Sequence, residues 1–201
     1  MREPDTMSGK KRASIVGLLC LLFLCPASAA DRMSPLPGLS IYNLTSRWTR
    51  QDGVETDLSA FRGHPVIVSM IYTSCPDICP LVAENMEQIE SALPERLRSQ
   101  VTFALFSFDP DKDTPSRLKD FASLHRLDMR HWALFRGDDA GVRELAAALD
   151  ISYRKNDDGS FDHAVVISLL DADGVVVYRQ VGFGTDAKDF VSHVEALAGT
   201  K

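Results

Sequence analysis

The chain has 201 residues, of which 45% are hydrophobic and 25% are charged, a composition typical of one globular domain with short appendages. Its formal net charge is −6, and no basic cluster lies beyond the first thirty residues. This acidic balance argues against nucleic acid as a partner. No internal repeat or low-complexity tract divides the chain.

Residues 1–29 have the pattern of a secretory signal. A basic stretch at 10–12 precedes an uncharged apolar run over 13–24, and small residues at 27–29 favour cleavage after Ala29. An uncleaved anchor is the alternative, although the apolar run is shorter than the roughly 20 residues that span a membrane. We therefore expect an exported, periplasmic protein, either soluble or tethered to the inner membrane by its N-terminus.

Two of the four cysteines, Cys20 and Cys25, lie inside the expected signal. Its removal would leave Cys75 and Cys79 as the remaining pair. In an oxidising compartment, two lone cysteines so close in sequence either form a disulfide bond or are held reduced by a metal or a partner.

The mature chain is expected to begin with an extended lead-in over residues 30–40, followed by one domain over residues 41–201. A β-hairpin is predicted over residues 42–57, because Asp52-Gly53 is a turn signal between two strand patterns. This hairpin precedes the part of the chain that carries the cysteines.

A nearly continuous apolar run over residues 66–72 predicts a central strand that is buried on both faces. The cysteine loop follows it directly. Apolar residues at helical spacing then predict a helix over residues 79–92, which Pro94 ends.

The remaining sequence alternates between strand and helix patterns. Five more strands are predicted, over residues 101–108, 131–135, 151–155, 164–170 and 175–181. The one over residues 151–155 is expected at an edge of the sheet. Helices are predicted over residues 114–127, 138–149 and 186–198. This order is that of an α/β thioredoxin-like fold, a central mixed β-sheet flanked by helices, here with an extra N-terminal β-hairpin.

Cys75 and Cys79 lie four residues apart at the start of the predicted helix, so both sulfurs can face the same way. The positive end of the helix favours thiolate over thiol. A disulfide staple, a redox couple and a metal clip all fit this loop. Two thiolates select copper(I), with zinc as the other common ion, and they leave room for a third ligand.

His163 is the candidate for that third ligand, because Asp162-His163 comes directly before the predicted strand whose start lies beside the active-site loop in a thioredoxin-like sheet. Asp162 is a candidate to accept the second ring N–H, although adjacent residues in an extended chain point opposite ways, so a solvated carboxylate is the alternative. No proline precedes this strand, and three residues rather than two separate the cysteines. Both features favour metal binding over general disulfide exchange. Surface or packing roles are expected for His64, His125, His131 and His193.

Three aspartates lie in the segment 109–115, at the end of the second central strand. The segment lacks the glycine and the distal glutamate of an EF-hand. We therefore predict a turn and a helix cap near the cysteines rather than a calcium site.

From about Leu36 to the C-terminus, the chain resembles the Sco/SenC proteins, copper-binding assembly factors for cytochrome c oxidase with a thioredoxin-like fold. Three segments in order carry the resemblance, which are residues 72–80, 109–115 and 162–174. It implies a site of Cys75, Cys79 and His163 that binds copper(I) and, in many members, copper(II).

The resemblance also implies a function, that of a copper chaperone which delivers copper to the binuclear copper centre of oxidase subunit II. An upstream copper donor protein would then be a second partner. The enzyme alternative is a thiol–disulfide reductase, in which Cys75 and Cys79 keep the copper-site cysteines of the target reduced. A peroxidase that uses Cys75 is a third reading.

Overall fold

The computed structural model describes residues 35–184 and 186–199, so the predicted signal with Cys20 and Cys25 lies outside the described residues. A seven-stranded mixed sheet forms the centre of the domain. Its strands, in spatial order, are β2 (Glu55–Asp57), β1 (Arg47–Arg50), β5 (Trp132–Arg136), β4 (Thr102–Ser107), β3 (Val66–Ile71), β8 (Val166–Leu170) and β9 (Val176–Val181).

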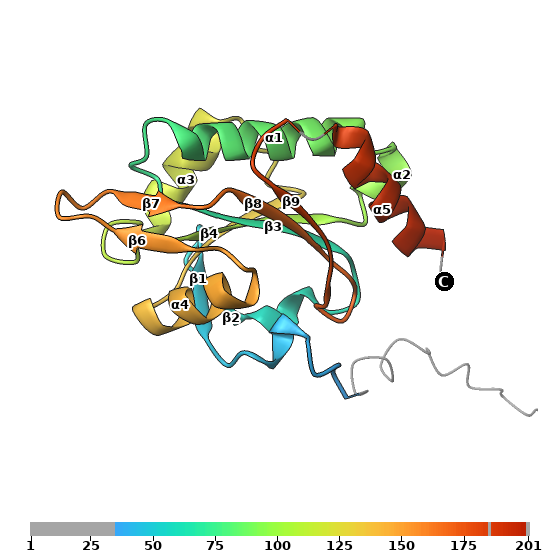
Figure 1. The fold of residues 1–201 in the computed structure, drawn as a ribbon, viewed down its shortest axis with the longest axis horizontal. Coiled ribbons are helices and arrows are strands. Elements are labelled where there is room, and N and C mark those ends of the chain that lie inside the picture. Colours follow the sequence, from blue (N-terminus) through green and yellow to red (C-terminus); the bar gives the residue numbers. More distant parts are fainter. Residues whose placement is uncertain (1–34, 185, 200–201) are drawn as a thin grey trace, which may run out of the picture.

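Two short strands lie outside this sheet. They are β6 (Tyr153–Lys155) and β7 (Phe161–His163), which pair with each other in antiparallel fashion. The α-helices are α1 (Ile78–Ala92), α2 (Glu95–Arg98), α3 (Pro115–Leu124), α4 (Asp139–Ala148) and α5 (Ala187–Gly199). In Figure 1, α1 and α3 cover one face of the sheet and α4 lies on the opposite face.

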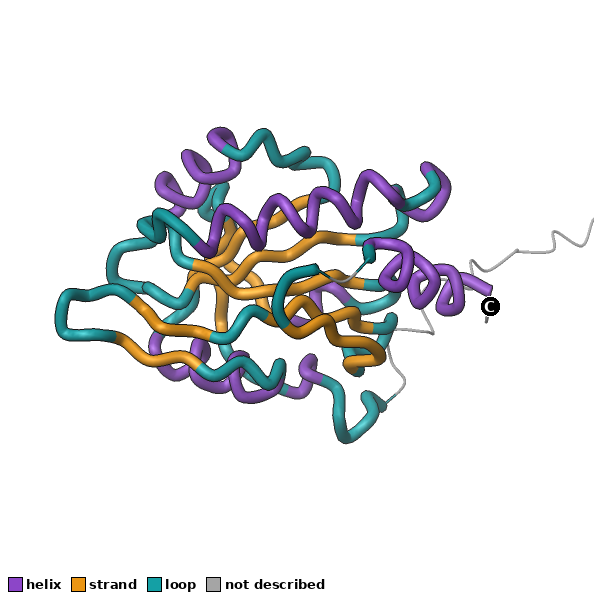
Figure 2. The backbone as a smooth tube through the Cα atoms, turned by 45° about the horizontal axis from the view of Figure 1, so that its top comes forward, coloured by secondary structure: helices purple, strands orange, loops and turns teal. Residues whose placement is uncertain are grey.

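The central strand β3 is buried along its whole length, as its continuous apolar sequence predicts. It runs parallel to β4 and antiparallel to β8. The tube in Figure 2 shows these strands between the helical layers. The cysteine loop therefore leaves the carboxyl end of a strand inside the sheet, where open α/β sheets place their sites. The predicted α/β architecture is confirmed.

The N-terminal hairpin forms as predicted but is shorter. β1 and β2 pair across Asp52-Gly53, whereas residues Ile41–Asn43 form a 3₁₀ turn capped by the Ser40 hydroxyl. The helix expected over residues 114–127 ends at Leu124, because Arg126 adopts a φ of +54°. The short helix α2 was not predicted.

The strand expected at an edge of the main sheet, over residues 151–155, was wrongly placed. It is β6 and pairs with β7, while β2 and β9 form the two edges of the main sheet. Local turn geometry explains the difference, since the Asn156 N–H donates to the Ser160 carbonyl at 2.8 Å and Gly159 takes a φ of +81°. The chain therefore reverses direction directly after β6, which pairs with β7 rather than with the main sheet.

Gly174 allows a close approach between the turn after β8 and the N-terminal segment. It has a φ of +79°, and a Cβ at this position would lie 2.6 Å from the Tyr42 ring.

We expect Gly182→Ala, at a position with a similar φ of +76° but in open space, to cost about 1 kcal/mol of unfolding free energy. Gly174→Ala should cost about 1–3 kcal/mol more because of the clash. Urea denaturation measures both, and equal losses would contradict the proposed contact.

None of the described helices is long and apolar enough to cross a membrane.

Candidate metal centre

The two cysteines sit where β3 gives way to α1. Cys79 lies in the first turn of α1, and Cys75 lies just before it. The Cys79 backbone N–H donates to the Cys75 sulfur at 3.4 Å, and the Tyr72 N–H donates to the Cys79 sulfur at 3.3 Å. Both are free thiols. Backbone donors thus point at both sulfurs, one from the first turn of α1 and one from the residue after β3.

The two sulfurs differ in environment. Burial acts to raise the pKa of the Cys75 thiol, but hydrogen bonds from the Cys79 and Asp77 backbones bring that pKa below its ordinary value. Burial, reinforced by the neighbouring Cys75, raises the pKa of the Cys79 thiol. The sequence predicts thiolate character for both sulfurs, whereas the structure favours it for Cys75 alone.

This asymmetry predicts selective alkylation of the metal-free, reduced protein. Cys79 is 0% exposed and Cys75 is 8% exposed, so iodoacetamide should modify Cys75 at least about tenfold faster. Peptide mass spectrometry over a time course measures the order. Equal rates for the two cysteines would contradict the buried position of Cys79.

His163 ends β7 and faces the cysteine pair. Its Nε2 lies 3.7 Å from the Cys79 sulfur, and its Nδ1 lies 3.1 Å from the Ala164 carbonyl oxygen. Because a carbonyl only accepts, Nδ1 carries the ring proton, and Nε2 of the neutral ring presents its lone pair towards Cys79. Burial lowers the pKa of His163 and so favours this neutral form. A neutral imidazole is the form that binds metals.

Asp162 does not support the His163 ring, and of the two roles considered from the sequence the structure shows the exposed carboxylate. Its carboxylate accepts hydrogen bonds from Arg154 at 2.7 Å and from Asn156 at 3.2 Å. Neighbouring side chains on a strand point to opposite faces, which turns Asp162 to solvent when His163 turns inward. The Ala164 carbonyl accepts the ring N–H of His163 instead.

Three of the other histidines make the packing or surface contacts that the sequence predicts. His64 contacts the Thr102 hydroxyl at 3.0 Å, and the rings of His125 and His193 lie against Phe121 and Tyr178. His131 directly precedes β5. Each is placed by partners other than the cysteines.

Aromatic side chains that follow β3 and β4 of the main sheet pack against the His163 ring. Its ring lies 4.9 Å from that of Phe108 and 6.3 Å from that of Tyr72, measured between centroids. Tyr72 also links the two halves of the site, since its hydroxyl is hydrogen-bonded to Cys75 and accepts from the Phe161 N–H at 3.5 Å. Burial raises the pKa of Tyr72 to about 12, which keeps the hydroxyl protonated. Sequence reasoning missed this role, because a tyrosine at the end of an apolar strand reads as core.

The three candidate ligands are neighbours rather than a closed cluster. In residues 35–184 and 186–199, no group of three or more histidine, cysteine, aspartate or glutamate side chains is already arranged to hold a metal ion. Cys79 lies next to both Cys75 and His163. Their donor set of two sulfurs and one imidazole nitrogen nevertheless fits copper.

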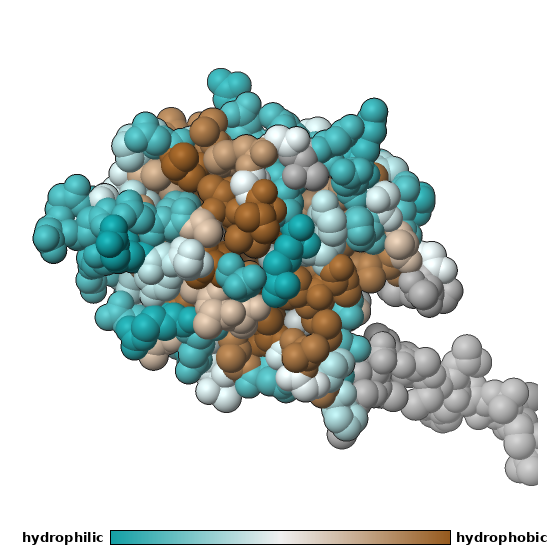
Figure 3. Space-filling model, in the orientation of Figure 1, coloured by the Kyte–Doolittle hydropathy of each residue, from teal (hydrophilic) through white to brown (hydrophobic). Residues whose placement is uncertain are grey.

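The surface next to the cysteines is partly apolar. Ile78 and Leu81, on the first turn of α1, are exposed, as are Val181 and Phe183 at the end of β9 and just beyond it. Figure 3 shows apolar side chains gathered on the face where β8 and β9 lie in Figure 1. Exposed apolar surface of this kind is typical of a contact with another protein.

Comparison with known proteins decides the family. The sequence model of the SCO1/SenC family matches residues 42–199, which is most of the chain. The chain belongs to the SCO1/SenC family. It is 27% identical over 187 residues to the SCO1 protein homolog of Bacillus subtilis, covering 91% of this chain and 95% of that protein.

Solved Sco structures share the fold, which confirms the thioredoxin-like prediction. The structure is similar to BsSco, described as a member of the Sco family of cytochrome c oxidase assembly proteins with a disulfide switch. The TM-score is 0.68 at 26% identity, over 77% of this chain and 92% of that one. It also resembles Bradyrhizobium japonicum ScoI with copper bound, with a TM-score of 0.64 at 23% identity over 76% and 96% of the two chains.

Proposed function

We propose that this SCO1/SenC protein is a copper chaperone that binds copper through Cys75, Cys79 and His163. The observation that carries the proposal is the lone pair of His163 Nε2, which faces the Cys79 sulfur at 3.7 Å beside a second thiol. Two soft sulfurs favour copper(I), and the imidazole nitrogen also suits copper(II).

The copper ion is the cargo of this site. Cys75 is 8% exposed and Cys79 is 0% exposed, so Cys75 is the more accessible of the two ligands, and a thiolate of a recipient protein displaces it first. The proposed recipient is the binuclear copper centre of cytochrome c oxidase subunit II, and an upstream copper donor protein loads the site. Family membership and the oxidase-assembly role of BsSco support this assignment.

Titration of the reduced protein with copper(I) tests the chaperone function. We expect one equivalent to bind tightly, and the double variant Cys75→Ala, Cys79→Ala to bind none at this site. Ser74→Ala is the matched control, because Ser74 is exposed in the same loop. Unchanged stoichiometry in the double cysteine variant would refute the proposal.

A thiol–disulfide reductase is the second candidate, favoured by the asymmetry of the thiols. The Cys75 thiolate would attack the target disulfide, form a mixed disulfide and release one target thiolate. The Cys79 sulfur, as a thiolate, would then attack Cys75, form the Cys75–Cys79 disulfide and release the second target thiolate. An external dithiol would reduce the pair again.

Trapping tests this second function. Cys79→Ala cannot resolve the mixed disulfide, so we expect a covalent complex between Cys75 and a copper-site apoprotein to accumulate. The Cys75→Ala variant serves as control and should form none. If the Cys79→Ala variant also forms no complex with an oxidised target, the reductase function is excluded.

We also propose export to the periplasm, supported by the charge and apolar pattern of residues 1–29. N-terminal sequencing of the protein from periplasmic and membrane fractions distinguishes a cleaved, soluble protein from one that is tethered by an intact N-terminus. A chain that begins at Ala30 in the soluble fraction supports cleavage. An intact N-terminus in the membrane fraction supports the tether, and recovery of the protein from the cytoplasm alone would contradict export.

A further inference from the structure

The hairpin of β6 and β7 holds His163 outside the main sheet. The two strands form their own sheet, and in Figure 1 they project beyond the other strands. At the base of the hairpin, the Ala164 N–H donates to the Ser152 carbonyl at 2.8 Å. This bond belongs to the hairpin itself. The position of His163 relative to the cysteines therefore depends on contacts between hairpin and domain.

One group of such contacts is aromatic. Phe161 of β7 packs 5.1 Å from Tyr72, and Tyr153 of β6 packs 5.0 Å from Phe108, measured between ring centroids. The Phe161 N–H points out of the hairpin ladder and donates to the Tyr72 hydroxyl. These contacts are mostly apolar. The polar tip of the hairpin is held by other groups.

The second group of contacts is ionic and lies at the loop that follows β4. Lys155 of β6 places its Nζ 3.3 Å from Asp111 Oδ2 and 4.0 Å from Asp109 Oδ1. Lys112 lies 3.6 Å from Asp109 Oδ2 and donates to the carbonyl of Gly159 at the hairpin tip at 3.4 Å. Both lysines therefore tie the hairpin to this loop.

Asp109 is unusual among the acidic residues of this loop. It is 0% exposed, and neither of its carboxylate oxygens has a hydrogen-bond partner in the described structure. A buried carboxylate is costly unless opposite charge compensates it. Lys112 and Lys155 supply that charge, so the buried Asp109 is an electrostatic anchor for an element that lies outside the main sheet.

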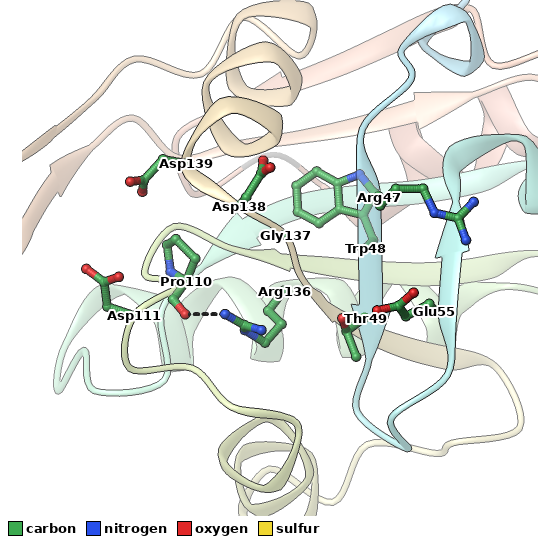
Figure 4. Close-up of a pocket in the computed structure, with 10 residues that line it drawn as sticks. All are labelled: Arg47, Trp48, Thr49, Glu55, Pro110, Asp111, Arg136, Gly137, Asp138 and Asp139. Carbon is green, nitrogen blue, oxygen red and sulfur yellow. Dashed lines mark hydrogen bonds between the residues drawn. The ribbon is translucent and has the colours of Figure 1, made fainter.

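The same loop also holds the cysteine side of the site. Buried Asp113 accepts hydrogen bonds from the Thr73 N–H at 3.0 Å and from the Thr73 hydroxyl at 2.5 Å, two residues before Cys75. Arg136 of β5 donates to the Pro110 carbonyl at 2.7 Å, the dashed line in Figure 4. The loop is therefore attached to β5, to the cysteine loop and to the histidine hairpin.

We propose that Lys155 is a positioning residue, and that its ion pairs with Asp109 and Asp111 form an ionic clamp that sets the distance between His163 and the cysteine pair. The proposal rests on the copper-binding function proposed above. Lys155 pairs with Phe161 in the hairpin register, two residues from His163, so displacement of Lys155 carries His163 with it. The clamp holds the third ligand near Cys79 before copper arrives.

The test compares Lys155→Met with Arg154→Met. Arg154 lies on the same strand but pairs with Asp162 at the solvent-exposed face of the hairpin, which makes it a matched control. In the metal-free protein we expect Lys155→Met to accelerate hydrogen exchange of the Phe161 amide, which bonds to Tyr72, relative to the Asn156 amide, which bonds within the hairpin. Copper affinity should fall about 10- to 100-fold, as for loss of an outer-shell partner.

Two further measurements separate loss of the lysine charge from misfolding of the variant. Lys155→Arg retains the charge and should restore both exchange and affinity. If Lys155→Met fails to fold, the wild-type protein still tests the clamp, because salt at about 1 M screens the Lys155–Asp111 pair, whose side chains are 49% and 73% exposed, and should selectively accelerate exchange at Phe161.

Each result bears on the proposal separately from the copper function. If neither Lys155→Met nor salt changes the exchange rate of the Phe161 amide, the clamp is overturned, whatever the copper affinity. It is also overturned if Lys155→Arg fails to restore the wild-type exchange rate. Faster exchange with unchanged copper affinity would overturn the link from the clamp to His163. A wild-type protein that binds no copper would refute the proposed function, while the exchange results would still show whether the ion pairs hold the hairpin.

Discussion

His163→Ala is expected to lower the affinity for copper by more than about 100-fold, because loss of a direct ligand exceeds the 10- to 100-fold loss typical of an outer-shell change. The side chain supplies the nitrogen donor whose lone pair faces Cys79 at 3.7 Å. Both cysteines remain, so disulfide reduction should be largely unchanged. The variant therefore separates the chaperone function from the reductase function.

Competition titration with a copper(I) chelator measures the affinity, and the copper(II) electron paramagnetic resonance spectrum reports the nitrogen ligand. His193→Ala is the control, since His193 lies on α5 with its ring stacked on Tyr178. Copper affinity and spectrum in His163→Ala equal to those of the wild-type protein would remove His163 from the ligand set.

Asp113→Ala is expected to lower the free energy of unfolding by about 4 kcal/mol or more. The carboxylate is 0% exposed and accepts from the Thr73 N–H, the Thr73 hydroxyl and, at 2.5 Å, the Ser107 hydroxyl. Hydrogen bonds to a charged group are worth about 1.5–3 kcal/mol each, and the substitution leaves three donors without this partner. The cysteine loop should lose its order as well, which would weaken copper binding.

Chemical denaturation of the metal-free protein measures this loss. Asp120→Ala is the matched control, because Asp120 is exposed on α3 a few residues further along the chain, and the change there should stay within about 0.5 kcal/mol. If Asp113→Ala proved no more destabilising than Asp120→Ala, the hydrogen bonds around Asp113 could not be what holds the cysteine loop.

Sequence reasoning predicted the cysteine half of the site well, because its determinants are local. The unbroken apolar run before Cys75 requires a strand with two covered faces, and the apolar spacing after Cys79 requires a helix. The loop between them is short, so both cysteines are confined to the helix N-terminus. Only the difference in burial between the two sulfurs was not evident from this pattern.

The histidine half was predicted less completely. The sequence singled out His163 just before a strand of the main sheet, but it did not show that His163 itself lies on a strand, and it left the role of Asp162 open. The structure places His163 on β7 and joins its ring to the Ala164 carbonyl. A three-residue strand has too weak a periodicity to be recognised in sequence, and pairing with β6 depends on a turn that only the folded chain reveals.

The sequence by itself therefore determined the type of fold, the pair of sulfurs and the identity of the third candidate ligand, because each depends on residues that are neighbours along the chain. The tertiary structure alone decided how near His163 comes to Cys79 and which groups hold it there. Those groups are Tyr72, Phe108 and the charges of Asp109 and Lys155, which come from separate elements. Contacts between residues so far apart arise only when the sheet, the loop after β4 and the hairpin pack together.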